Sequence, residues 1–108
     1  MSHTSPFRPE LPEGWSYPDA ESARGLHDEL QRELPPGHLL AGRAVEVFAW
    51  RDGATDDVLF RHVQEPGRFT VVHLSWSGKP EINAHYPTVE YDGSFEDFVA
   101  AEQQAFDE

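Results

Sequence analysis

His62 and His73 are the two residues whose type and spacing could bring chemistry to one surface of this protein. They lie in short β-rich runs on either side of Pro66-Gly67, a pair typical of a tight turn. Counting outward from that turn places both imidazoles on one sheet face as diagonal neighbours, about 7 Å apart. With a carboxylate such as Glu46 they would form a metal or small-ligand site. The alternative is that both histidines are half-buried structural residues.

Three aspartates, Asp52, Asp56 and Asp57, are predicted to share one hairpin loop with Gly53. They resemble a calcium loop only superficially, because the spacing and terminal glutamate of the EF-hand are absent. Aspartate beside glycine is what turn geometry prefers. We therefore interpret the three aspartates as turn residues.

No other motif indicates a reaction. The segment Ser75-Trp76-Ser77-Gly78 lacks the glycines that a nucleophile elbow places on both sides of its serine. Gly78-Lys79 lacks the upstream glycine and the following hydroxyl residue of a phosphate-binding loop. The sequence contains no cysteine, so thiolate chemistry and disulfides are excluded. We assign no catalytic residue and no cofactor, and the sequence favours a protein that is not an enzyme.

The elements that would position the histidines form an antiparallel meander between residues 43 and 76. Valine, phenylalanine, tryptophan and threonine gather in three short runs bounded by Gly, Pro or Asp, and Thr88–Tyr91 is a candidate fourth strand. With a two-residue loop at Pro66-Gly67, His62 faces Val71, and side-chain alternation defines two faces. One face would carry Leu59, Val63, Val72, Leu74 and Trp76, and the other Val58, Phe60, His62, Phe69, Val71 and His73.

A helix is predicted on each side of the meander. Asp19 can cap the first, whose leucines recur every four residues from Leu26 until Pro35 ends it, with Glu29 on its solvated face. Ser94 can cap the second, whose apolar stripe is Phe95, Phe98, Val99, Ala105 and Phe106. We expect an α+β fold, with an antiparallel three- to four-stranded meander sheet packed with an N-terminal and a C-terminal helix. The C-terminal helix should cover the face that bears Leu59, Val72 and Leu74.

The first 18 residues differ in composition from the rest of the chain. Prolines at positions 6, 9, 12 and 18 predict an extended leader, and residues 19–108 are then a single α+β domain. Trp15 and Tyr17 near the end of the leader are large enough to dock on that domain. A proline-rich recruiting ligand is the alternative interpretation of the leader.

The chain is strongly acidic, with 20 acidic and eight basic residues and a formal net charge of −12. Such a field repels phosphate groups, so direct binding to nucleic acid or to an anionic membrane is disfavoured. The charge suits a basic protein partner, although it could serve solubility alone. No apolar stretch of signal-peptide or transmembrane type is present, and we expect a cytoplasmic protein.

The charge and the aromatic residues together indicate a binding function. Trp50 and Trp76 lie at predicted strand ends and, with Asp56 and Asp57, are candidate partner-binding residues. The leading hypothesis is a small acidic non-enzymatic interaction module, of an immunity or regulatory type. A metal- or small-ligand-binding domain using the His62/His73 face is the alternative. A nucleic-acid mimic, with carboxylates aligned along one face, is a third.

The sequence from Val71 to Gly78, VVHLSWSG, is the distinctive phrase of the chain, followed by FEDFVAAE. In these runs the chain resembles a group of small uncharacterised bacterial proteins that share a VVHLxWSG-like strand and a following aromatic-acidic helix. The resemblance covers about residues 34–102. It implies a free-standing bacterial domain with a helix after Ser94, and it supplies no activity, cofactor or site residue.

Overall fold

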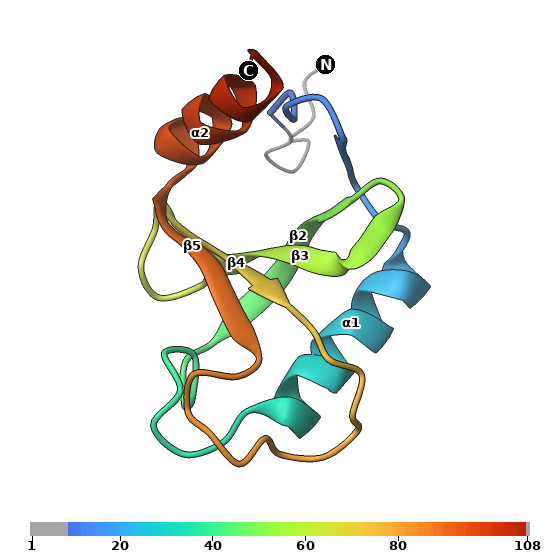
Figure 1. Ribbon diagram of the computed structural model, residues 1–108, viewed down its shortest axis with the longest axis vertical. Coiled ribbons are helices and arrows are strands. Elements are labelled where there is room, and N and C mark those ends of the chain that lie inside the picture. The colour runs from blue at the N-terminus through green and yellow to red at the C-terminus, as the bar shows by residue number, and fades with distance from the viewer. Residues whose placement is uncertain (1–8, 108) are drawn as a thin grey trace, which may run out of the picture.

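A computed structural model describes residues 9–107 of the chain as a five-stranded antiparallel sheet with one helix on each face (Figure 1). The strands are hydrogen-bonded in chain order, β1-β2-β3-β4-β5. The elements are β1 (Trp15–Ser16), α1 (Ala20–Glu33), β2 (Val45–Arg51), β3 (Ala54–His62), β4 (Arg68–His73), β5 (Thr88–Ser94) and α2 (Phe95–Asp107). The α+β class and the two helices are as predicted, while the strand count of three to four was too low.

The additional strand comes from the proline-rich leader. In β1, Trp15 pairs with Arg51 and Ser16 pairs with Trp50, which makes this two-residue strand one edge of the sheet. Trp15 is buried, and its ring meets the ring of Phe98 edge-on at 5.1 Å between centroids. The leader is thus part of the folded domain from Leu11 onward, since Leu11 packs against the same core and Pro12 is buried. Its first eight residues lie outside the described part of the chain.

The hairpin between β2 and β3 is tighter than predicted. Its turn contains only Asp52 and Gly53, and Gly53 adopts the left-handed φ of +74° that such turns require. Strand β3 therefore begins at Ala54, so that Asp56 and Asp57 are strand residues. Their placement in one loop with Asp52 was wrong.

The pairing of β3 with β4 corrects the predicted register. Asp57 pairs with His73 and Phe60 pairs with Thr70, whereas the two-residue loop placed Phe60 opposite His73. The predicted turn exists, with Arg68 N–H donating to Glu65 O at 3.0 Å, but five residues, 63–67, connect the strands. The register is displaced by three residues. Because side chains alternate along a strand, this odd displacement puts His62 and His73 on opposite faces of the sheet.

Each face of the sheet is therefore covered by its own helix and its own apolar core. The α1 core contains Leu26, Leu30, Leu40, Val45, Val58, Phe60, Val72 and Leu74. The α2 core contains Trp15, Ala49, Leu59, Phe69, Val71 and Phe98. The C-terminal helix covers Leu59 as predicted, but Val72 and Leu74 lie on the opposite face, under α1.

Both helices begin at the predicted caps. Asp19 Oδ1 accepts a hydrogen bond from Ser22 N–H at 2.7 Å, and Ser94 Oγ accepts one from Asp97 N–H at 3.1 Å. Leu34 ends α1 immediately before Pro35, as the sequence predicts. Ala105 and Phe106, the end of the predicted apolar stripe, lie outside the described side chains. Within the described residues, neither helix has the length and apolar character needed to cross a membrane.

Candidate functional site

The segment Ser75–Gly78, here called the Trp76 loop, is fixed to α1 by buried carboxylates. Glu33 Oε1 accepts the backbone N–H of Ser75 at 2.9 Å, and its Oε2 accepts that of Trp76 at 2.6 Å. Glu29 Oε2 accepts the backbone N–H of Gly78 at 2.9 Å. Both glutamates are buried, Glu33 completely. The carboxylates of Glu29 and Glu33 thus accept hydrogen bonds from loop N–H groups, as the backbone carbonyls of a neighbouring strand would do in a sheet.

Burial of two carboxyl groups one helical turn apart changes their acidity. Burial raises the pKa of Glu33, and the hydrogen bond with Glu29 raises it further. The same hydrogen bond lowers the pKa of Glu29, which also accepts from Gly78 N–H. Of the two carboxyl groups, Glu33 is therefore the weaker acid.

Trp76 has an unusual backbone conformation, with φ at +60°. A bulky residue in the left-handed region costs of order 1–3 kcal/mol, which the surrounding structure must offset. Here the hydrogen bonds to Glu33 hold the backbone, and Gly78 supplies a second left-handed position at φ +73°. The indole remains half-exposed, and its Nε1–H donates to Asp56 Oδ1 at 2.9 Å. A strained residue thus presents a large aromatic side chain to solvent.

Other exposed apolar side chains lie in the same region. The segment between β4 and β5 runs around the C-terminal end of α1, where Glu81 N–H donates to Glu33 O, and meets the loop that follows α1 (Figure 1). Among the described residues, five large apolar side chains are exposed, and four of them lie on these two loops. They are Leu39, Trp76, Ile82 and Tyr86, and we call them the exposed apolar set.

Buried His38 holds the two loops together. Its Nδ1 accepts the backbone N–H of Leu40 at 3.0 Å, so Nε2 carries the proton and donates to Pro87 O at 2.7 Å. His38 is a structural residue, and it restrains the loops that present the exposed apolar set.

The structure separates the two histidines that the sequence placed together. His62 lies on the α1 side of the sheet and is buried, while His73 lies on the α2 side and is half-exposed. Thr70 Oγ1 donates to the Asp92 carboxylate at 2.7 Å, so it accepts from His62 Nε2–H at 2.7 Å. His62 is therefore a buried structural histidine, and burial lowers its pKa. Glu46, the suggested third ligand, pairs instead with Arg61.

The four predicted partner-binding residues also divide into two pairs. Trp76 and Asp56 are hydrogen-bonded to each other at the surface. Trp50 packs against the α1 core, and Asp57 is largely buried in an ion pair with Arg51 at 2.9 Å. The binding candidates that reach the surface are therefore half-exposed Trp76 and partly exposed Asp56.

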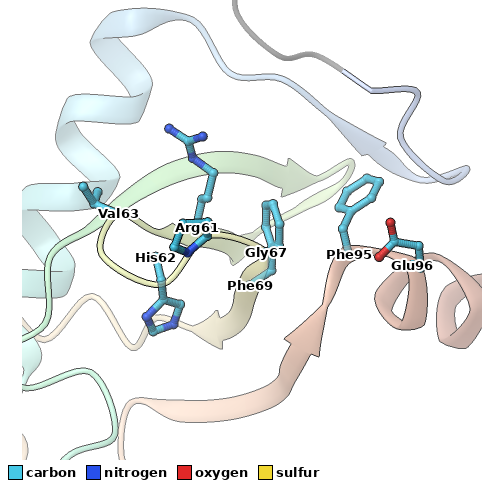
Figure 2. A pocket seen from close by; sticks show the side chains of 8 residues that line it. Arg61, His62, Val63, Gly67, Phe69, Phe95 and Glu96 are labelled. Atoms are coloured by element: carbon cyan, nitrogen blue, oxygen red, sulfur yellow. The ribbon is translucent and has the colours of Figure 1, made fainter.

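A cavity of about 350 Å³ lies between the β3–β4 turn and the start of α2 (Figure 2). Phe69 and Phe95 give it an aromatic lining. Figure 2 shows the side chains of Arg61 and His62, which also line it, pointing in opposite directions from adjacent positions of β3. The cavity is at the opposite end of the β3–β4 pair from His73, so the two histidines cannot contribute to one ligand site.

Sequence reasoning missed the buried glutamates and assigned Glu29 to the solvated face of the helix. One local signal was present, because Glu29 and Glu33 each follow a core leucine, Leu26 or Leu30, by three positions. Residues at this spacing are neighbours on a helix surface, so both glutamates border the apolar stripe.

The chain matches no known family model, no curated protein and no solved structure.

Proposed function

We propose that this protein is a non-enzymatic interaction module that binds a basic partner protein through Trp76 and the other members of the exposed apolar set. The observation that carries the proposal is the conformation of Trp76, which is held at φ +60° by buried Glu33 while its indole remains half-exposed. Strained, over-determined residues gather at functional sites. Exposed tryptophan is also among the residues that dominate binding energy at protein interfaces.

A fixed loop lowers the entropic cost of binding. The backbone of the Trp76 loop is bonded to α1 at three positions, Ser75, Trp76 and Gly78, so little order remains to be gained on association. Ordering a flexible side chain at an interface costs about 0.5–1.5 kcal/mol, and pre-ordering the surface avoids part of that cost.

The acidity of the chain supports a basic partner. A net charge of −12 accelerates association with a positively charged surface and repels nucleic acid. Asp56 places a carboxylate directly beside the Trp76 indole, so a basic side chain of the partner could pair with it while apolar groups pack on the ring. An immunity-type or regulatory role in the cytoplasm is consistent with such a module.

Comparative capture from the source organism tests this function. Wild-type protein, Trp76→Ala and Val63→Ala would be immobilised equally, and the retained proteins quantified. Val63 is the matched control, because it is similarly exposed but lies in the β3–β4 connection. We expect one basic protein to be retained by the wild type and by Val63→Ala, at low salt, and lost with Trp76→Ala. Equal retention by all three variants would contradict the proposal.

A further inference from the structure

Among the described histidines, His73 has the geometry best suited to binding an external ligand. Its Nδ1 lies 2.6 Å from Asp57 Oδ1, and since a carboxylate only accepts, the neutral ring donates from Nδ1 and keeps a lone pair on Nε2. Its side chain is 48% exposed, in contrast to buried His38 and His62. Neutral imidazole binds metal ions through such a lone pair, which makes Nε2 of His73 a candidate ligand atom.

Glu90 of β5 brings a second carboxylate to the same place. Val71 pairs with Tyr91 and Val72 with Val89, so Glu90 is an extra residue at an irregularity of the β4–β5 ladder. Such bulges redirect a side chain and are common beside functional sites. One potential ligand atom from each of Asp57, His73 and Glu90 lies within 4.8 Å of the other two.

The charges around this cluster favour a cation. Arg51 pairs with Asp57 at 2.9 Å and with Glu102 at 3.1 Å, so one guanidinium faces three carboxylates when Glu90 is counted. Asp57 and Glu90 place two carboxylates beside the single imidazole of His73, so the cluster contains more acidic than basic groups. Trp15 covers the far side of Arg51, with the guanidinium 4.6 Å from the ring centroid.

We propose that Asp57, His73 and Glu90 form a binding site for a divalent transition-metal ion of the zinc class, with water completing the coordination. One imidazole and two carboxylates suit Zn²⁺ and its first-row neighbours. Bonds of about 2.0–2.2 Å place the ligand atoms closer together than 4.8 Å, so the site must contract. His73 and Glu90 are exposed and can rotate inward. Rotation of the His73 ring breaks its hydrogen bond with Asp57 and allows Nε2 to bind the ion.

This site is separate from the proposed protein-binding surface. Asp57, His73 and Glu90 gather with Glu102 of α2, whereas the Trp76 loop is fastened to α1. The metal proposal therefore does not depend on the proposed function.

The test is calorimetric titration of the chelator-treated full chain with Zn²⁺, compared for wild type, His73→Ala, Glu90→Gln and the control His85→Ala. His85 is an exposed histidine outside the cluster. We expect one tight site in the wild type and in His85→Ala, with affinity at least tenfold weaker in His73→Ala and in Glu90→Gln. Asp57→Ala is avoided, because it would also break the Arg51 ion pair.

Two further measurements separate loss of zinc binding from loss of folding. Circular dichroism and thermal unfolding establish that each variant is folded, and nuclear magnetic resonance of the imidazole nitrogens reports whether zinc perturbs His73. Zinc affinity in the wild type no tighter than millimolar, affinity unchanged in His73→Ala, or an unperturbed His73 signal at saturation would each overturn the proposal.

Discussion

Glu33 of α1 accepts the backbone N–H of Trp76 at 2.6 Å, across 43 positions of sequence. This contact joins a fully buried acid to a half-exposed tryptophan with a positive φ. Neither the burial of Glu33 nor the positive φ of Trp76 follows from the local sequence, but the contact between the two residues accounts for both. The buried carboxyl group satisfies loop N–H groups that would otherwise be unpaired, and the loop N–H groups make burial of the acid tolerable.

Removal of the Glu33 carboxyl group should destabilise the fold. Glu33→Ala leaves the N–H groups of Ser75 and Trp76 without their acceptor and opens a cavity, so we expect a loss of roughly 2–4 kcal/mol in the free energy of unfolding. Glu33→Gln keeps one acceptor and should lose less. Asp28→Ala, an exposed acid of the same helix, is the control. Urea denaturation measures all three, and equal stability of Glu33→Ala and the control would refute the role of Glu33.

The backbone of Trp76 predicts an inversion of the usual order of alanine and glycine. At φ +60° any side chain is strained, so Trp76→Gly should be more stable than Trp76→Ala by about 1 kcal/mol. The same pair of substitutions at fully exposed Ile82 provides the comparison, where glycine should give no advantage. Thermal unfolding of the four variants decides the matter, and an alanine variant as stable as glycine at position 76 would argue against the strain.

His62 and His73 should titrate on opposite sides of their ordinary pKa of 6.5 in chelator-treated protein. Burial, followed by the charge of Arg68, lowers the pKa of His62, while the hydrogen bond to Asp57 raises the pKa of His73. Nuclear magnetic resonance titration of the imidazoles measures both. The reverse order of the two midpoints would contradict the assigned environments.

The same shifts affect stability with opposite signs. The pKa of His62 is lower in the folded state than in the unfolded chain. As the pH falls below about 6.5, the unfolded chain therefore binds more protons at this residue, and the free energy of unfolding decreases. The contribution of His73 is present below about pH 6.5 and is lost as the pH rises through its raised pKa. We expect His62→Gln to lose less stability than the wild type between pH 6.5 and about 5, measured by urea denaturation.

Local signals in the sequence were sufficient for the helices and insufficient for the site. Asp19 and Ser94 were correctly predicted as caps, because a cap acts within three residues of itself. The register of β3 and β4 depends on how many residues connect the strands, and Pro66-Gly67 marks the turn without fixing that number. An error of three residues was enough to place His62 and His73 wrongly on one face.

Long-range contacts could not be read from local patterns. Glu29 and Glu33 resemble residues of a solvated helix face, and only the folded chain brings Gly78 and the Trp76 backbone to their carboxyl groups. Strand β1 has two residues and gains its stability from the burial of Trp15 against α2. The Asp57–His73–Glu90 cluster similarly requires three strands in correct register.

Partner binding through Trp76, as proposed, can be measured as the affinity of the captured basic partner. Titration calorimetry at low and at high salt would compare wild type, Trp76→Ala and Val63→Ala, each verified to be folded. A binding hot spot is worth about 2 kcal/mol or more, so Trp76→Ala should weaken binding by roughly 30-fold, while Val63→Ala leaves it unchanged. Equal affinity of Trp76→Ala and the wild type would contradict a role of Trp76 in partner binding.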